Sequence, residues 1–303
     1  MTVTVFSPAK INLYLAVTGR RPDGFHDLVS VVSTLDYGDE LTATLVPAGE
    51  GAKFRLECDR TDVPLDESNL ILRAARAFAE ATGWPGPGDA LAVSFQLTKR
   101  IPVGAGLGGG SSNAVAALRC LGRLHPDALT GARLEAVAAT LGSDCALFLR
   151  NAPVIIRGRG ERVELLPAAA VERLRGQRLL LFKPSFGIST PWAYGRMAAE
   201  APRHYCPPDE AEERLAVWLR SRGSLADLLF NNMEGVAFGK HLALPVLLEK
   251  LRRKFGVSVR MSGSGSACFA LVEDRPATVV TGMEQTIRES WGDGVFIKDV
   301  RLG

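Results

Sequence analysis

The sequence predicts a two-domain protein of mixed α and β structure. Its 303 residues are long for one hydrophobic core and suit two domains of about 150 residues each. Alternating apolar patterns, typical of strands, dominate residues 2–58, whereas stretches with helical spacing become frequent later. The chain closes on a strand, loop, strand, helix and strand pattern that resembles a split β-α-β sandwich. The expected fold class is therefore α+β.

Each element follows from its own pattern of residues. Strands are predicted over 2–7, 10–18, 29–35, 40–46, 53–58 and 91–97, and helices over a segment capped by Ser68, over a segment ending near His125 and over 130–141, where Gly142 is the C-cap. The second half is predicted to begin with a hairpin at 154–165 and a strand at 178–183, followed by a helix that starts at Pro191. Helices are then predicted at 208–221, 225–238, 243–255 and 276–290, and strands at 257–261, 267–272 and 294–301. The hairpin marks the predicted boundary between an N-terminal domain (1–157) and a C-terminal domain (158–303).

The composition excludes several classes of protein. A net charge of +3 with scattered basic residues argues against a nucleic-acid partner. Five cysteines without a C-x-x-C pair indicate neither a disulfide framework nor a zinc site. Without an apolar run of 18 residues or a targeting pattern, we expect no membrane partner and a cytoplasmic location. Whether the protein is a monomer or a homodimer stays open.

A glycine-rich stretch between Ile101 and Ala114 carries the main functional signal. Five of the seven residues from Gly104 to Gly110 are glycine, a Ser-Ser pair follows, and a run with helical spacing comes next. Ser111 or Ser112 is the expected N-cap. A glycine loop that opens a helix presents backbone N–H groups at the positive end of the helix dipole, which indicates a phosphate site.

Other glycine-rich loops fit this stretch less well. A Walker A loop requires Gly-Lys-Ser/Thr, and the stretch contains no lysine. Gly104, Gly106 and Gly109 match the dinucleotide fingerprint, but Thr98-Lys99-Arg100-Ile101-Pro102 separates the preceding strand pattern from the loop, whereas that fingerprint follows a strand directly. A flexible linker is not bordered by a capped amphipathic helix. Phosphate binding is therefore the favoured interpretation.

Three motifs in order resemble the GHMP kinases, the family of galactokinase, homoserine kinase and mevalonate kinase. They are Ser7-Pro8-Ala9-Lys10-Ile11-Asn12-Leu13, the glycine loop with its Pro-x-Gly-x-Gly-Leu-Gly-x-x-Ser-Ser signature, and Met261-Ser262-Gly263-Ser264-Gly265-Ser266-Ala267-Cys268-Phe269. The resemblance implies an N-terminal domain of ribosomal-protein-S5-like fold and a ferredoxin-like C-terminal domain. The active site is expected between them.

Within the GHMP kinases the resemblance is to the members that act on 4-diphosphocytidyl-2-C-methyl-D-erythritol. It is carried by Arg21-Pro22-Asp23-Gly24-Phe25-His26, Leu35-Asp36-Tyr37-Gly38-Asp39, Glu67-Ser68-Asn69-Leu70-Ile71 and Gly142-Ser143-Asp144. The implied reaction is phosphorylation of the 2-hydroxyl of this substrate from ATP in non-mevalonate isoprenoid biosynthesis. Mg²⁺ is the implied metal.

The resemblance also assigns the catalytic pair. On their own, Lys10 fits an ordinary exposed strand lysine and Asp144 fits a helix cap. The resemblance makes Asp144 the general base and places Lys10 beside it, where an ammonium would keep the carboxylate ionised and stabilise a developing alkoxide. The two residues thus become one functional pair.

The remaining assignments divide between ATP and the substrate. ATP is assigned to Asn69, Lys99, Pro102, Gly104, Gly106, Leu107, Gly108, Gly109, Gly110, Ser111 and Ser112, with Ser111 or Ser112 as the magnesium contact. The substrate is assigned to Asn12, Phe25, His26, Tyr194, Gly263 and Gly265, and packing beside Trp192 is the alternative for Tyr194. The family commonly has tyrosine at Phe25 and Val-Pro at Cys145-Ala146. Neither departure removes a catalytic group.

Three other functions compete with this one. A GHMP kinase acting on homoserine or mevalonate is the nearest, and the Pro-Asp-Gly-Phe-His loop argues against it. A catalytically silent nucleotide-binding regulator would need neither Lys10 nor Asp144. A hydride-transfer dehydrogenase would need a strand directly before the glycine loop.

Overall fold

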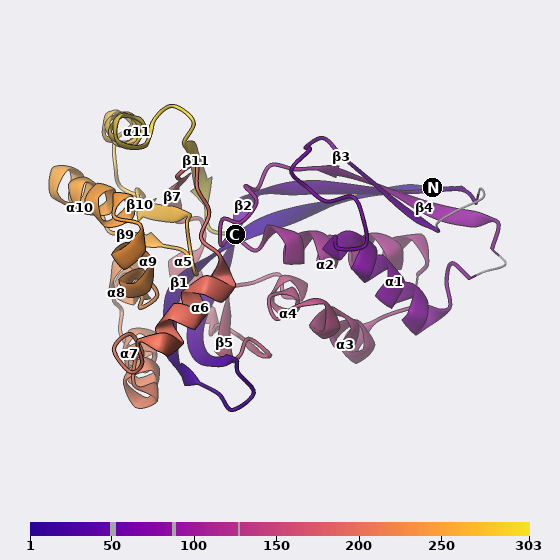
Figure 1. Cartoon of the computed structure of the whole chain (residues 1–303), viewed down its shortest axis with the longest axis horizontal. Helices are drawn as coiled ribbons and strands as arrows, with labels where there is room; N and C mark the ends of the chain where they lie inside the picture. The colour runs from indigo at the N-terminus through magenta and orange to yellow at the C-terminus, as the bar shows by residue number, and fades with distance from the viewer. Residues whose placement is uncertain (49–52, 87–88, 127) are drawn as a thin grey trace. The chain divides into compact units, whose positions relative to one another are not determined.

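The computed structural model describes residues 1–48, 53–86, 89–126 and 128–303 (Figure 1). Its contacts divide the chain into two compact units that are interleaved in sequence. The first unit contains Met1–Ala9, Tyr37–Val103 and Gly108–Asn151. The second contains Lys10–Asp36, Gly104–Leu107 and Ala152–Gly303. The predicted boundary after residue 157 stays a prediction.

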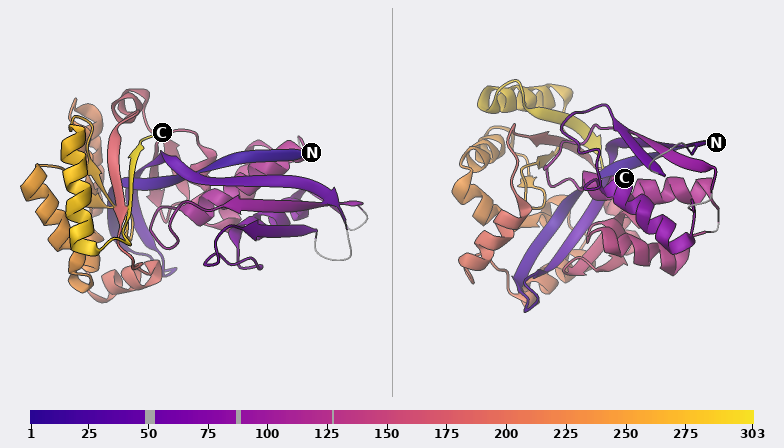
Figure 2. Two further views of the ribbon diagram at one scale, coloured as in Figure 1. Left: turned by 90° about the horizontal axis from the view of Figure 1, so that it is seen from above. Right: turned by 45° about the vertical axis from the view of Figure 1, so that its right-hand side comes forward.

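The first unit packs helices on one face of a sheet. Its strands lie in the order β3 (Phe54–Cys58), β4 (Leu91–Thr98), β2 (His26–Pro47) and β1 (Thr2–Arg20), of which β1 and β2 also extend into the second unit. Its helices are α1 (Leu70–Thr82), α2 (Gly109–Leu124), α3 (Gly131–Leu141) and α4 (Cys145–Leu149). In Figures 1 and 2, α1 and α2 lie along one face of these strands. The apolar side of α1, including Phe78, is buried, as its helical spacing predicts.

Two predicted strand breaks are wrong. The segments expected at 2–7 and 10–18 form the single strand β1, and those expected at 29–35 and 40–46 form the single strand β2. Gly38 shows why the strands continue: a Cβ atom there would lie 2.3 Å from the carbonyl oxygen of Ser7 and 2.7 Å from Pro8 Cα. Pro8 and Gly38 therefore allow β1 and β2 to approach each other closely and do not form a turn.

The second unit contains an antiparallel sheet with the strand order β11-β7-β10-β9. These strands are β7 (Arg178–Lys183), β9 (Val259–Met261), β10 (Cys268–Leu271) and β11 (Phe296–Arg301). The helices α10 (Ala243–Phe255) and α11 (Ala277–Trp291) cover one face of this sheet (Figures 1 and 2) and share an aliphatic core with it. In sequence order the strands are arranged 4-1-3-2, the ferredoxin-like arrangement that the end of the sequence suggests.

Further elements complete the second unit. They are β5 (Val154–Gly158), β6 (Arg162–Leu165), β8 (Phe230–Asn231), α5 (Ala168–Leu174), α6 (Thr190–Ala199), α7 (Pro208–Arg220), α8 (Leu225–Leu228) and α9 (Glu234–Lys240). The helix predicted over 225–238 is wrong, because β8 interrupts it to pair with β1. The α+β prediction is confirmed. No helix in the described part of the chain combines the length and apolar character that crossing a bilayer requires.

Candidate active site

The predicted site residues are distributed between the two compact units. Asp144, the two serines and part of the predicted ATP set belong to the first unit. Lys10, the predicted substrate set and residues 104–107 belong to the second. The pairing of Lys10 with Asp144 stays a prediction. The contacts described below are therefore those that each predicted site residue makes within its own unit.

The start of α2 presents the predicted phosphate site. Gly108 is the N-cap and has a φ of +69°, so the predicted N-cap at Ser111 or Ser112 is wrong. A left-handed residue at 108 lets the helix begin one turn earlier than a serine cap would. The Ser112 N–H donates to the Gly108 carbonyl at 2.9 Å and begins the helical ladder. The N–H groups before it have no partner within a helix and can bind a phosphate.

Close packing explains the glycine at position 109. A Cβ atom there would lie 2.9 Å from Lys99 Nζ and 3.1 Å from Ile101 Cγ2, so no side chain fits without moving them. Pro102 is half-buried and Gly110 is exposed. The loop therefore packs against the end of β4 through Gly109 and keeps Gly110 at the surface.

A buried carboxylate, missed from the sequence, joins this loop to β4. Asp39 is fully buried and pairs with Lys99 Nζ. Its Oδ1 accepts the backbone N–H groups of Arg100 and Ile101, both at 2.7 Å, and its Oδ2 accepts Asn113 Nδ2 at 2.8 Å. Asp39 thus anchors the segment that enters the glycine loop and the first turns of α2. Lys99, predicted to contact adenosine, also donates to Asn113 Oδ1 at 3.0 Å.

A chain of hydrogen bonds continues from Asn113 to Ser112. Asn113 Nδ2 donates to Ser7 Oγ at 2.8 Å, and Ser7 Oγ donates to Ser112 Oγ at 2.8 Å. Ser112 is buried and already accepts one hydrogen bond, whereas Ser111 is partly exposed. Of the two serines proposed as the magnesium contact, Ser111 is therefore the more accessible. Among the described residues, no group of three or more His, Cys, Asp or Glu side chains is arranged to hold a metal ion.

Asn69 caps α1 instead of Ser68, so the Ser68 prediction is wrong by one residue. Its Oδ1 accepts the Ile71 N–H at 2.9 Å, and its Nδ2 donates to the Pro64 carbonyl at 2.7 Å. Ser68 instead donates its hydroxyl to Asp66 at 2.6 Å. The predicted adenosine contact of Asn69 stays a prediction, and its side chain already fixes the start of α1.

Asp144 is partly exposed at the N-cap position of α4. Within the described structure its carboxylate makes no capping hydrogen bond to that helix, and its backbone is in the right-handed helical region. The structure thus does not support capping as the role of its side chain. Burial raises the pKa of the neighbouring Cys145 thiol to about 11, so this cysteine is not a nucleophile at neutral pH.

In the second unit, Lys10 and Asn12 form a buried polar pair on β1. Lys10 Nζ donates to Asn12 Oδ1 at 2.8 Å, and Asn12 Nδ2 donates to Ser30 Oγ at 2.9 Å. Lys10 is only 6% exposed, so the alternative of an ordinary exposed strand lysine is wrong. The Lys10 N–H also donates to the carbonyl of Leu107 at 2.9 Å. The strand thereby contacts the predicted ATP loop within this unit.

The C-terminal glycine loop, residues 262–266, lies against this pair. A Cβ atom at Gly263, which has a φ of +59°, would lie 3.2 Å from Asn12 Oδ1 and 3.6 Å from Lys10 Nζ. A Cβ atom at Gly106 would lie 2.8 Å from the Ser262 carbonyl oxygen and 3.0 Å from that of Gly265. Two glycine-containing loops therefore pack backbone to backbone beside Lys10 and Asn12.

Gly106→Ala should lower kcat/KM at least roughly 10-fold, because the methyl group would push the two glycine loops apart and its backbone has a φ of +77°. Gly83→Ala is the matched control: its φ is also +77°, a Cβ atom there would meet open space, and the residue has no predicted role in binding. This control carries the same backbone strain without the collision. Steady-state kinetics of both variants decide the matter, and equal losses would contradict the close-packing argument.

The predicted base-binding residues gather around His26. His26 is buried, and its ring centroid lies 4.9 Å from that of Tyr194. Its Nε2 lies 3.0 Å from the hydroxyl of Tyr205, a residue without a predicted role. Burial, followed by the charge of Arg20, lowers the pKa of His26, so the imidazole is neutral at neutral pH. Phe25 is 55% exposed, and the Arg159 guanidinium lies over its ring, 4.9 Å from the centroid.

Known proteins resemble the chain over both halves. The family model of the GHMP kinases N terminal domain matches residues 69–152, and that of the GHMP kinases C terminal region matches residues 214–288. A 4-diphosphocytidyl-2-C-methyl-D-erythritol kinase of Synechococcus sp. (strain CC9902) is 38% identical over 282 residues, covering 90% of this chain and 88% of that protein. A protein of the same name from Methylacidiphilum infernorum (isolate V4) is 34% identical, covering 98% of this chain and 95% of that protein.

Solved structures agree with these relatives. A crystal structure of 4-(cytidine 5'-diphospho)-2C-methyl-D-erythritol kinase has a TM-score of 0.75 and 32% identity, covering 99% of this chain and 100% of that one. A homoserine kinase from Cytophaga hutchinsonii has a TM-score of 0.71 at 16% identity, covering 99% and 95%, and shares the fold alone. The predicted two-domain GHMP kinase fold is confirmed. The chain therefore belongs to the 4-diphosphocytidyl-2-C-methyl-D-erythritol kinase family of the GHMP kinases.

Proposed function

We propose that this kinase transfers the γ-phosphoryl group of ATP to the 2-hydroxyl of 4-diphosphocytidyl-2-C-methyl-D-erythritol, a step of non-mevalonate isoprenoid biosynthesis. The observation that carries the proposal is a match over 90% or more of the chain to relatives named for this substrate. GHMP kinases use ATP, so the donor follows from the family. The buried Lys10–Asn12 pair and the exposed Phe25 beside His26 are consistent with this reaction.

In this reaction Asp144 accepts the proton of the attacking hydroxyl. The Lys10 ammonium stabilises the negative charge of the alkoxide as it forms. Asn12 fixes the Lys10 ammonium through their 2.8 Å hydrogen bond, which limits the rotamers open to a long side chain. Phosphoryl transfer depends mainly on positioning and on charge neutralisation, and these residues supply both.

The ATP phosphates bind at the start of α2. The N–H groups of the first turn and the helix dipole stabilise their negative charge. Mg²⁺, when bound, neutralises phosphate charge, and magnesium usually keeps several waters and few protein ligands. The partly exposed Ser111 hydroxyl fits such a sparse ligand set better than Ser112, whose oxygen already accepts the Ser7 hydroxyl.

The cytosine base stacks between Phe25 and Tyr194 in this proposal. Phe25→Ala should raise the KM for the cytidylyl substrate roughly 5- to 150-fold, since base stacking on an aromatic ring contributes about 1–3 kcal/mol. The KM for ATP should barely change. Phe6→Ala is a suitable control, because Phe6 is another half-exposed phenylalanine (47%) and belongs to the first unit. An unchanged substrate KM in both Phe25→Ala and Tyr194→Ala would remove the stacking assignment.

A substrate panel tests the function directly. ATP consumption is measured with 4-diphosphocytidyl-2-C-methyl-D-erythritol, homoserine and mevalonate, each at several concentrations. The proposal expects a kcat/KM for the cytidylyl substrate far above that of the other two alcohols. Turnover of homoserine or mevalonate alone would assign the chain a different GHMP activity. The cytoplasmic location stays a prediction that cell fractionation would test.

A further inference from the structure

A short segment in the second unit interrupts what the sequence predicts as one helix. The helix α8 ends at Leu228, β8 covers Phe230–Asn231, and α9 begins at Glu234. The strand β8 pairs in parallel with β1, with Phe230 opposite Tyr14 and Asn231 opposite Leu15. The chain thus leaves a helical path to place Asn231 beside the strand that carries Lys10 and Asn12.

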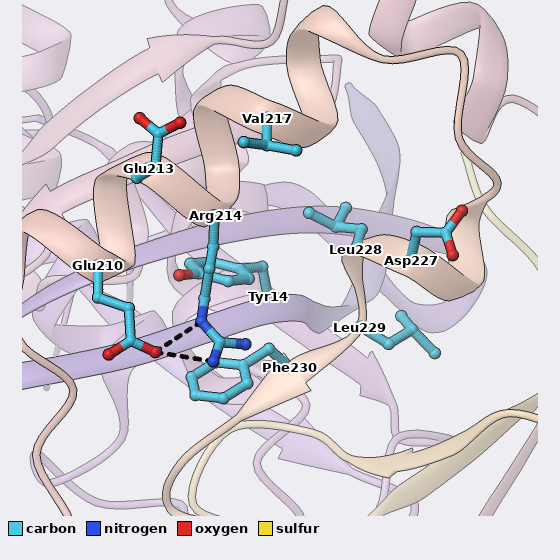
Figure 3. Close-up of a pocket in the computed structure, with 9 residues that line it drawn as sticks. All are labelled: Tyr14, Glu210, Glu213, Arg214, Val217, Asp227, Leu228, Leu229 and Phe230. Carbon is cyan, nitrogen blue, oxygen red and sulfur yellow. Dashed lines mark hydrogen bonds and ion pairs between the residues drawn. The ribbon is translucent and has the colours of Figure 1, made fainter.

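Figure 3 shows how this strand is anchored. A pocket of about 360 Å³ is bordered by Tyr14 of β1, by α7 and by the segment from Asp227 to Phe230. The ring of Phe230 lies 5.6 Å from that of Tyr14, and the guanidinium of Arg214 lies 4.9 Å from the Phe230 ring. Glu210 holds that guanidinium at 2.7 Å. The packing of Phe230 against Tyr14 and Arg214 therefore helps to fix the position of β8, and hence of Asn231.

The Asn231 carboxamide makes three hydrogen bonds, all of them to backbone groups. The side chain is 5% exposed, its Nδ2 donates to the carbonyl of Met261 at 2.8 Å and to that of Gly263 at 2.9 Å, and its Oδ1 accepts the Met233 N–H at 2.9 Å. The two accepting carbonyls lie on either side of Ser262. Both hydrogens of one amide group thus hold the start of the C-terminal glycine loop.

This contact determines where Gly263 lies. Without the amide, two buried carbonyls would lose their donor, and the loop would have to turn to find other partners. Gly263 has a left-handed backbone, and a Cβ atom there would lie 3.2 Å from Asn12 Oδ1 and 3.6 Å from Lys10 Nζ. A rotation of the loop would therefore change the surroundings of the Lys10 ammonium. Glu234 supports the same loop, because its Oε1 accepts the Met261 N–H at 2.8 Å.

We propose that Asn231 is a positioning residue for phosphoryl transfer, which holds the 261–263 backbone against the Lys10–Asn12 pair. The inference rests on the proposed function of Lys10. It assigns to Asn231 an effect on the chemical step rather than on the affinity for ATP. A misplacement of about 1 Å near reacting groups can lower a rate by roughly 10²-fold.

Asn232 provides a matched control. Like its neighbour it makes three hydrogen bonds to backbone groups: its Oδ1 accepts the Val17 N–H at 2.9 Å, and its Nδ2 donates to the carbonyls of Val17 at 2.8 Å and His204 at 2.9 Å. These partners belong to the far part of β1 and to the segment before α7. Asn231→Ala and Asn232→Ala should therefore lose similar amounts of stability, while only the first releases the glycine loop.

The experiment compares Asn231→Ala, Asn231→Asp and Asn232→Ala with the wild type. We expect both Asn231 variants to lower kcat roughly 10- to 100-fold with little change in the KM for ATP, and Asn232→Ala to keep most of the wild-type kcat. Asn231→Asp keeps the size of the side chain but removes both donors. Hydrogen exchange of the backbone at 259–268 should rise in the Asn231 variants only. Thermal unfolding verifies that all three are folded.

The outcomes separate this inference from the proposed function. Equal kcat losses in Asn231→Ala and Asn232→Ala, or unchanged exchange at 259–268, would overturn the positioning role. A wild-type protein that ignores the cytidylyl substrate but turns over homoserine or mevalonate would overturn the proposed function alone, and the kcat comparison would then use that alcohol. If none of the three alcohols is turned over, the exchange measurement still decides whether Asn231 holds the loop.

Discussion

Asp144→Asn is expected to lower kcat by roughly 10²-fold or more while the fold and the affinity for ATP change little. An amide of the same size cannot accept the hydroxyl proton, so only the chemical step suffers. In the described structure the carboxylate makes no capping hydrogen bond to α4, so the substitution removes no side-chain cap from that helix. Single-turnover kinetics and calorimetric titration of ATP measure the two quantities separately.

Two further variants sharpen this result. Asp274→Asn changes an exposed aspartate of the second unit and should leave kcat near the wild-type value. Lys10→Met should also lower kcat, and the double variant with Asp144→Asn should be little worse than Asp144→Asn alone if the two residues act as a pair. Near-normal kcat in Asp144→Asn would remove the general-base assignment, and fully additive losses would remove the pairing.

Asp39→Ala should lower the free energy of unfolding by about 3–5 kcal/mol, because it leaves the buried Lys99 ammonium without its counter-charge. The backbone N–H groups of Arg100 and Ile101 also lose their acceptor. Urea denaturation of the purified protein measures the change. A loss below about 1 kcal/mol, the scale of an exposed ion pair, would contradict the buried arrangement.

A double substitution identifies the source of that loss. Asp39→Ala combined with Lys99→Met removes both charges, so it should be more stable than Asp39→Ala alone. It should not regain the full wild-type stability, since the two backbone N–H groups stay without the carboxylate. Glu67→Ala, which breaks the exposed ion pair with Arg76, is the control and should change stability little. A double variant no better than Asp39→Ala would locate the effect in the backbone contacts.

Local patterns predicted most elements but not the contacts that interrupt or join them. The glycine loop and α2 were predictable because glycine content and helical spacing are properties of one short stretch. The helix predicted over 225–238 was wrong because Asn231 bonds to carbonyls thirty residues away, which no local period reveals. The breaks predicted at Pro8 and Gly38 were wrong for a related reason: turn-type residues also allow two strands to approach closely.

The roles of the candidate site residues were likewise predictable only where a local motif marks them. Residues with a recognisable motif around them, such as Lys10 and Asp144, could be proposed from the sequence. Asp39 could not be given a role, because an aspartate in a strand pattern indicates nothing until its partner from residue 99 is known. Tyr205 carried no signal either, since it lies between elements and its contact with His26 spans 179 positions.

The interleaving of the two units has a consequence for the order in which the protein can fold during its synthesis. The first unit is complete once Asn151 has been made, but Lys10–Asp36 belongs to the second. The backbone of Thr34 accepts the N–H of Gly303 at 3.0 Å, and Leu35 bridges to Leu302. At roughly 5–20 residues per second, the ribosome needs about 8–30 s to add the remaining part. During that time the part of β1 that carries Lys10 and Asn12 can pair with β2, but it still lacks β8 and the later core residues that cover Leu15 and Val17. The growing chain therefore exposes an apolar strand surface until the second unit has been made.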